Sequence, residues 1–368
     1  MSSLTQTRDY NFNAGPSALP IEVLTEVQDE LLNYKDSGKS IIESSHRSKE
    51  YEEVHFETLN NLTTLLDCKD SHSLILMNGG ARMQFALVPM NLVREGQIAE
   101  YIVTGTWAKG AYDEACKIPG IETNAVWSGV EDNFNRIPNP DEYSVNNKAA
   151  YLHYASNNTI FGTQFHTPPE SGDIPLVADM SSDILCRPMD ISNHSLIYAG
   201  AQKNLGPAGL SVVAIRNDHL ESCPGNLTSA FDYKVLQAKD SLLYTPNCFA
   251  IYVVGLVTRK IIEMGGLEEI QKINNAKAKL IYDTIDNSGG YYKGTCTKES
   301  RSIMNVTINL QSEELEKKFV TESIGAGFSG LKGHRSVGGI RASTYNSVPL
   351  ESVEALVSFM NEFQASNG

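Results

Sequence analysis

LIYAGAQKNLGPAG, residues 196–209, runs from an apolar segment through small residues and one lysine into a turn rich in glycine and proline. This order predicts a buried strand followed by a tight loop that holds Lys203 at the carboxyl edge of a sheet. Open α/β sheets bind ligands at that edge. Because the neighbours of Lys203 are small, a bulky group could also lie against the backbone there.

A carboxylate follows a second apolar segment upstream. Residues 174–178 run directly into Asp179, which precedes Lys203 by 24 residues. Pyridoxal phosphate requires a lysine that can form an imine and a carboxylate that can face its pyridinium nitrogen. Taken alone, the two residues also fit solvated side chains at the ends of two strands.

The composition describes an ordinary globular protein. The chain has 368 residues, of which 41% are hydrophobic and 20% charged, and its net charge is −14. The acidic balance argues against a nucleic-acid partner. No apolar run approaches the ~20 residues of a membrane-spanning helix, and the first ten residues are polar, so we expect a cytoplasmic protein without a membrane partner. The six cysteines are scattered and read as free thiols, with no predicted metal site.

Six strand-like runs separated by helix-length spacers predict an α/β layer with a mostly parallel sheet. They lie near residues 74–77, 98–103, 151–155, 174–178, 196–200 and 210–215. Beyond a long helix with Phe249, Val253 and Ile261 on one face, the pattern becomes α+β, with a strand predicted from about Ser336 to Tyr345. We therefore predict a large domain over residues 1–256 and a small C-terminal domain over 257–368. Residues 1–20 form an N-terminal segment that is expected to pack on the small domain.

A glycine-rich loop follows the first of these strands. Gly79-Gly80-Ala81-Arg82 precedes an apolar helix-like stretch, residues 83–92. A strand, a glycine turn and a helix N-terminus can together bind a phosphate, since free N–H groups and the helix dipole face the anion. An ordinary β–α turn fits the local sequence equally well. Trp107, which follows the strand 98–103, can cover an aromatic ring or belong to the core.

Two His-Arg pairs are separated by most of the chain. His46-Arg47 lies in a polar segment, and His334-Arg335 is followed by a further arginine, Arg341. Each arginine fits a carboxylate or phosphate group, and each histidine adds a donor. Solvated turns are the alternative for both pairs.

Considered together, seven stretches resemble the phosphoserine aminotransferases, a family of class V aminotransferases that use pyridoxal phosphate. They are NFNAGPSALP, SHRSKEY, the Gly-Gly-Ala-Arg loop, GTWAKGAYDEA, ADMSSDILCRPMD, YAGAQKNLGPAGL and LKGHRSVGGIRAS. The resemblance covers nearly the whole chain and is most specific in YAGAQKN and GHR…GGIRAS. It implies the type I fold of pyridoxal-phosphate-dependent transferases.

The resemblance also implies roles for individual residues. Lys203 would form the imine with the cofactor, and Asp179 would pair with the pyridinium nitrogen. Trp107 would stack on the ring, and Thr159 would bind the 3-hydroxyl. The phosphate would be held by four residues, namely Ala81, Arg82, Gln202 and, from a second subunit, Thr245. Sites of this kind require a homodimer.

The implied reaction is the reversible transfer of the amino group of L-glutamate to 3-phosphohydroxypyruvate, giving O-phospho-L-serine and 2-oxoglutarate in serine biosynthesis. Arg341 would bind the α-carboxylate of the substrate. The distal phosphate or carboxylate would be bound by His46, Arg47, His334 and Arg335.

Other functions remain as alternatives. An alanine–glyoxylate or serine–pyruvate aminotransferase would share the fold, but its substrates lack a distal anion. A cysteine desulfurase would need a nucleophilic cysteine, and nothing singles out one of the six. Lys203 and Asp179 argue against a non-catalytic binding protein, and a nicotinamide dehydrogenase would need a glycine fingerprint that the sequence lacks.

Overall fold

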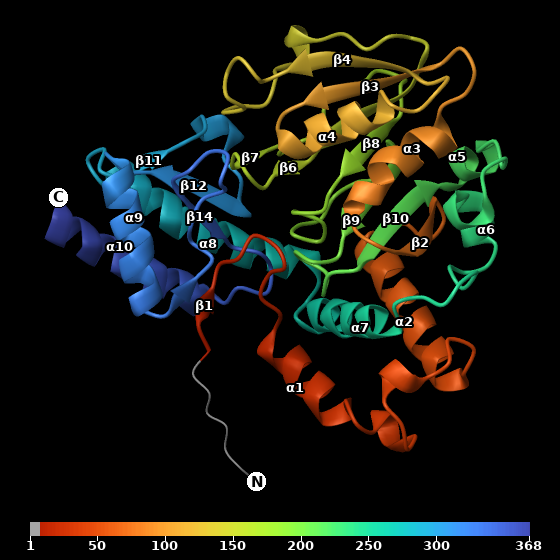
Figure 1. Cartoon of the computed structure of the whole chain (residues 1–368), viewed down its shortest axis with the longest axis horizontal. Coiled ribbons are helices and arrows are strands. Elements are labelled where there is room, and N and C mark those ends of the chain that lie inside the picture. The colour runs from red at the N-terminus through yellow and green to blue at the C-terminus, as the bar shows by residue number, and fades with distance from the viewer. Residues whose placement is uncertain (1–7) are drawn as a thin grey trace.

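The centre of the molecule is a seven-stranded sheet with the order β2-β10-β9-β8-β5-β3-β4 (Figure 1). The computed structural model describes residues 8–368. The strands of this sheet are β2 (His72–Asn78), β10 (Leu210–Arg216), β9 (His194–Gly200), β8 (Leu176–Asp179), β5 (Ala149–Ala155), β3 (Ile98–Val103) and β4 (Glu122–Ser128). All but β4 correspond to strands predicted from the sequence.

The sheet is mostly parallel, as predicted. The pairs β9–β8, β8–β5, β5–β3 and β3–β4 are parallel, whereas β10 is antiparallel to both of its neighbours. Because β10 reverses direction between them, β2 and β9 run the same way. The carboxyl ends of β2, β3, β5, β8 and β9 therefore meet at one edge, where open α/β sheets hold ligands.

Helices cover both faces of this sheet, which is consequently buried through most of its length. One face packs on α2 (Lys49–Leu65) and α7 (Cys248–Glu263), the other on α3 (Gln84–Leu92) and α4 (Thr106–Ala115). Successive residues of a strand divide between the two cores, so that Leu76 faces α2 and α7 while Ile75 and Met77 face α3.

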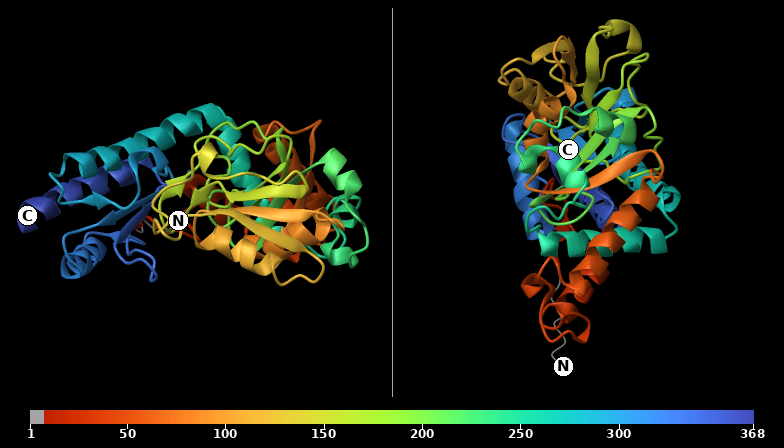
Figure 2. Two further views of the ribbon diagram at one scale, coloured as in Figure 1. Left: turned by 90° about the horizontal axis from the view of Figure 1, so that it is seen from above. Right: turned by 90° about the vertical axis from the view of Figure 1, so that its right-hand side faces the viewer.

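The C-terminal part has its own core beside the large sheet (Figure 2). Its three-stranded antiparallel sheet has the order β11-β12-β14. The elements of this part are α8 (Leu267–Asn287), β11 (Lys293–Gly294), β12 (Asn305–Asn309), α9 (Glu313–Gly325), β13 (Phe328–Ser329), β14 (Ile340–Ser343) and α10 (Leu350–Asn367).

The N-terminal strand β1 (Tyr10–Asn11) pairs with β13 in parallel, and Phe12 and Ala18 are buried in the C-terminal core. Residues 1–7 of the predicted segment lie outside the described residues. The domain boundary after residue 256 stays a prediction. Helix α7 crosses it, and Leu267 and Ile270 at the start of α8 still pack in the core of the large sheet.

The remaining elements are short. They are α1 (Ile21–Glu30), α5 (Asn217–Ser222), α6 (Tyr233–Gln237), the hairpin of β6 (Asn157–Asn158) and β7 (Thr163–Gln164), and 3-10 turns at Tyr34–Asp36, Ile41–Glu43, Ala81–Met83, Pro140–Glu142, Ser229–Phe231 and Lys298–Ser300. Within residues 8–368 no helix is both long and apolar enough to cross a membrane.

One element was predicted too long. The sequence indicated a strand from about Ser336 to Tyr345, but β14 occupies only Ile340–Ser343. Gly338 and Gly339 both have positive φ, 71° and 70°, which is incompatible with a regular strand. Residues 333–339 therefore form a loop, and the second His-Arg pair lies on it.

Candidate active site

Lys203 lies just beyond the end of β9, at the carboxyl edge of the sheet. Its side chain is buried, and its Nζ donates a hydrogen bond to Thr159 Oγ1 at 2.5 Å. Burial is the main cause that lowers the pKa of this amine to about 8; the charge of Asp179 opposes the shift, and the charge of Arg341 adds to it. A buried amine with a lowered pKa is suited to act as a nucleophile or a proton carrier near neutral pH.

Asp179 is the last residue of β8 and is buried beside Lys203. Its Oδ1 accepts hydrogen bonds from the backbone N–H and the hydroxyl of Ser181, at 2.9 and 2.6 Å. That hydroxyl in turn accepts from Gly200 N, at the end of β9. Burial raises the pKa of Asp179, and the two bonds from Ser181 oppose the shift. The arrangement fixes one carboxylate oxygen, while the other has no donor among residues 8–368, which suits a cationic ring nitrogen.

Thr159 lies on the β6–β7 hairpin, which passes from the large sheet to the C-terminal part. The carbonyl of Thr159 accepts a hydrogen bond from Arg341 Nη1 at 3.1 Å. Thr159 thereby contacts both the predicted imine-forming lysine and the predicted carboxylate-binding arginine. Burial lowers the pKa of Arg341, and its Nε is a buried donor without a partner in the described part of the chain.

The glycine-rich loop lies at the end of β2, at the same edge. Gly79 N donates to the carbonyl of Gly209 at 3.1 Å, and Asn78 Nδ2 donates to the carbonyl of Thr245 at 3.0 Å. Ala81 and Arg82 form the 3-10 turn that leads into α3. The loop thus presents a helix N-terminus beside the turn that follows Lys203, as an anion site requires.

Several buried polar atoms at this sheet edge have no hydrogen-bond partner within residues 8–368. Besides Arg341 Nε, they include Trp107 Nε1 and Gln202 Oε1. Trp107 is the second residue of α4, and Gln202 precedes Lys203. Native proteins leave few buried polar groups unsatisfied, so three of them at one sheet edge fit a polar ligand such as pyridoxal phosphate.

A cavity of about 610 Å³ adjoins Arg341, between the large sheet and the C-terminal part. His334 lines it from the 333–339 loop, and Phe134 and Phe161 line it from the large domain. Arg335, on the same loop, is exposed and faces a separate groove beside α9.

The first His-Arg pair and Thr245 lie apart from this cavity within one chain. His46 and Arg47 follow the 3-10 turn at Ile41–Glu43, and neither lines the cavity beside Arg341. Thr245 is exposed and is tied to Asn78 of its own chain. One chain therefore brings together Lys203, Asp179, Thr159, Arg341 and His334, but not the first His-Arg pair.

A second buried carboxylate near the site, Asp183, was not predicted from the sequence. Asp183 accepts a short hydrogen bond from the Ser156 hydroxyl and another from Gln164 Nε2, at 3.1 Å. Burial raises the pKa of Asp183. The run Ser181-Ser182-Asp183 directly after an apolar strand was the available signal, because polar residues at a strand's carboxyl end face the binding edge.

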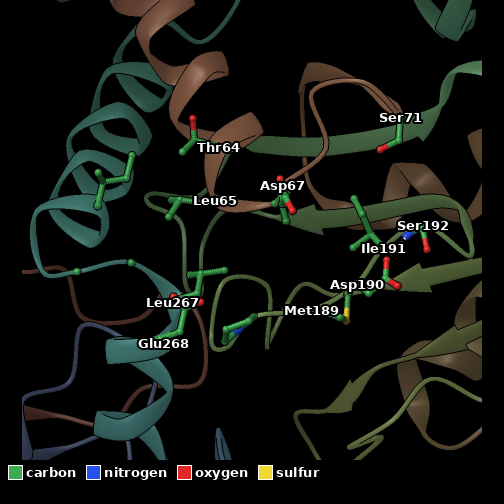
Figure 3. Close-up of a pocket in the computed structure, with 15 residues that line it drawn as sticks. Thr64, Leu65, Asp67, Ser71, Met189, Asp190, Ile191, Ser192, Leu267 and Glu268 are labelled. Carbon is green, nitrogen blue, oxygen red and sulfur yellow. Dashed lines mark hydrogen bonds between the residues drawn. The ribbon is translucent and has the colours of Figure 1, made fainter.

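A larger groove of about 850 Å³ lies elsewhere, between the end of α2, residues 188–192 and the start of α8 (Figure 3). None of the predicted site residues lines it. Among the described residues no group of three or more His, Cys, Asp or Glu side chains is placed to hold a metal ion, and all six cysteines are free thiols.

The chain also matches known proteins along most of its length. The family model for class V aminotransferases matches residues 9–356. A phosphoserine aminotransferase of Geobacillus kaustophilus is 53% identical over 97% of this chain and 98% of its own. The chain belongs to the phosphoserine aminotransferases of class V.

Solved structures of this family have the same fold. The phosphoserine aminotransferase of Bacillus circulans subsp. alkalophilus superposes with a TM-score of 0.95 at 50% identity, covering 98% of this chain and 99% of that one. The pyridoxal-phosphate-bound phosphoserine aminotransferase of Trichomonas vaginalis gives 0.91 at 38% identity, covering 96% of this chain and all of that one. The chain is thus a pyridoxal-phosphate-dependent transaminase, as the sequence predicted.

Proposed function

We propose that this aminotransferase transfers the amino group of L-glutamate to 3-phosphohydroxypyruvate, giving O-phospho-L-serine and 2-oxoglutarate, as a step of serine biosynthesis. The observation that carries the proposal is the contact of Thr159 with both Lys203 and Arg341. The amine binds the side chain of Thr159 and the guanidinium binds its backbone carbonyl, so a nucleophile and a carboxylate-binding group lie close to one residue.

The cofactor is proposed to bind at the carboxyl edge, where it would supply an electron-accepting ring. Lys203 would provide the amine that holds it and would carry the proton between the substrate's Cα and the cofactor. Asp179 would face the ring nitrogen and Trp107 the ring surface, with Thr159 at the 3-hydroxyl. The phosphate would be held by Ala81, Arg82, Gln202 and Thr245.

For the substrate, we propose that Arg341 binds the α-carboxylate and His334 the distal anion. The buried guanidinium of Arg341 has an unused Nε, and a charge-assisted pair there is stronger than a neutral hydrogen bond. Arg335 would join the distal site. A pocket for a distal anion favours phosphorylated or dicarboxylic substrates over pyruvate and glyoxylate.

The working unit is proposed to be a homodimer. His46 and Arg47 lie away from Arg341 within one chain, so a second chain would supply them. Large apolar side chains are exposed on the N-terminal elements, with Leu32 at 85% and Ile42 at 57% exposure. Large exposed apolar side chains are candidates for a subunit interface. A cytoplasmic location stays a prediction.

The test is a coupled transamination assay with glutamate as donor. We expect 3-phosphohydroxypyruvate to be a far better acceptor, by kcat/KM, than hydroxypyruvate, pyruvate or glyoxylate, because only it carries the distal phosphate. Lys203→Ala is the control without the catalytic amine. Equal or higher activity with pyruvate or glyoxylate would instead place the enzyme with the alanine–glyoxylate type.

A further inference from the structure

A second buried lysine lies behind the site, on α8. Lys277 is completely shielded from solvent, and its Nζ donates hydrogen bonds to the backbone carbonyls of Tyr345 and Val348, at 2.7 and 3.0 Å. No carboxylate in the described part of the chain forms an ion pair with it. Burying a lysine without an ionic partner costs folding free energy. We therefore expect its two hydrogen bonds to have a structural or functional role.

The two hydrogen bonds do not depend on the charge of the lysine. Burial lowers the pKa of Lys277 to about 7, with the Cys186 thiol as the titratable group near it. An amine has two N–H groups and an ammonium has three. Either form can therefore bind both carbonyls.

The carbonyls that Lys277 holds belong to the turn directly after β14, the strand that carries Arg341. Within this turn, the Tyr345 hydroxyl donates to the carbonyl of Ala14 at 2.8 Å. Ala14 begins a segment that lies on the lysine loop, since Ser17 N donates to the carbonyl of Gln202 at 2.9 Å. The turn thus supports the strand of Arg341 and the segment covering the Lys203 loop.

Asn346, in the same turn, connects it to the residue after Lys203. Its backbone N–H donates to Asn204 Oδ1 at 3.0 Å, and its Nδ2 donates to the carbonyl of Leu185 at 2.8 Å. Its Oδ1 accepts from Asn274 Nδ2 of α8 at 2.8 Å. One turn therefore contacts both sides of the active site, and Lys277 holds that turn from behind.

We propose that Lys277 is a positioning residue for amino transfer. By holding the carbonyls of Tyr345 and Val348, it fixes where Arg341 lies relative to Lys203. The inference rests on the proposed function, in which Arg341 binds the α-carboxylate.

The test compares Lys277→Met with Lys279→Met. Both changes replace a lysine of α8 by methionine, but Lys279 is exposed and forms an ion pair with Asp283 of the same helix. All constants are expressed per cofactor-loaded site. A smaller fraction of folded or cofactor-loaded protein therefore does not alter the comparison between variants. The measurements are KM for glutamate, kcat, the Kd of 2-oxoglutarate by calorimetry, and Tm.

For Lys277→Met we expect KM for glutamate and the Kd of 2-oxoglutarate to rise about tenfold, or about 1.4 kcal/mol, with a smaller fall in kcat. Lys279→Met should match the wild type. A lower Tm with KM and Kd unchanged per site would show that Lys277 serves stability alone and would overturn the proposal.

If Lys277→Met does not fold, Asn346→Ala tests the same turn through a different residue. It removes the side-chain hydrogen bonds to Leu185 and Asn274 and should raise KM for glutamate and the Kd of 2-oxoglutarate about threefold. Unchanged constants would again refute the positioning role.

The Kd of 2-oxoglutarate also separates this proposal from the proposed function. A wild type that binds this dicarboxylate but does not aminate 3-phosphohydroxypyruvate would refute the proposed function and leave Lys277 testable.

Discussion

Burial of the Lys203 amine has a consequence for pH dependence. Its pKa is lowered to about 8, so the amine is mostly protonated below that pH and mostly neutral above it. Only the neutral amine can attack an aldehyde. The rate at which cofactor-free enzyme captures pyridoxal phosphate should therefore rise as pH increases through about 8 and level off above it.

Stopped-flow absorbance over a series of buffers measures this rate directly. Well below the pKa we expect the rate to fall about tenfold for each pH unit. A midpoint near the ordinary lysine value would contradict the effect of burial on this amine.

Arg335 offers a prediction about substrate choice. Arg335→Ala should lower kcat/KM for 3-phosphohydroxypyruvate by about tenfold to a hundredfold, because a hydrogen bond to a charged group contributes about 1.5–3 kcal/mol. Hydroxypyruvate, which lacks the phosphate, should react as before. A steady-state comparison of the two acceptors measures the difference, and an equal loss for both would argue against a phosphate-binding role.

At the scale of residues, the sequence predicts groups that follow strands better than groups inside helices. Lys203 and Asp179 were recognised because each ends an apolar run. Lys277 was not, although Ile270, Asn274, Lys277 and Ile281 share one helical face. Polar residues within such an apolar face signal a buried polar network, but their partners on another element cannot be read from the spacing.

At the scale of elements, the β6–β7 hairpin joins the large sheet to the C-terminal part. The carbonyl of Gly162 accepts from Ser302 N at 2.8 Å, and Gly162 has a φ of 75°. A Cβ there would collide with the hydroxyl of Thr307 and approach the carbonyl of Asn305. The hairpin can therefore lie against β12 only because this residue is glycine.

Gly162→Ala should lower the free energy of unfolding by about 1–2 kcal/mol from the left-handed backbone alone, and by more because of the collision. It should also lower kcat/KM, since the hairpin carries Thr159. Gly172→Ala is the matched control, with a φ of 58° and open space around it. Denaturant unfolding and the standard assay compare the two, and an equal cost for both would contradict the close packing.

Elements with a strong hydrophobic pattern in their own sequence were predicted, whereas elements whose course depends on neighbouring parts of the fold were not. The buried strands have continuous apolar runs, whereas β4 alternates at the sheet's edge with every residue partly exposed or exposed, and it lacks such a run. Residues 336–339 were predicted to begin a strand, but they belong to the loop at 333–339. Its course is set instead by two positive-φ glycines and by a backbone bond from Gly333 N to Gly339 O, at 2.9 Å.

At the scale of the whole molecule, the proposed dimer can be tested on its exposed apolar residues. Leu32→Asp should favour monomers, because a charge would be buried without a partner in the interface. Activity should fall with the dimer. Ile324→Asp, at a residue 65% exposed on α9, is the control and should leave assembly unchanged. Sedimentation velocity measures both, and a Leu32→Asp protein that stays dimeric and fully active would exclude this surface.

The N-terminal segment packs in the same core as the C-terminal part, and this affects the order in which the chain can fold during translation. Ala14 is held by Tyr345, 331 residues later, and β1 pairs with β13. The segment covering the Lys203 loop cannot make these two contacts until residues 328–345 have left the ribosome. The large sheet can form earlier, from contacts closer in sequence. A nascent chain arrested before residue 328 should therefore hold a folded sheet but an open cofactor site, so that loading with cofactor becomes a late, post-translational event.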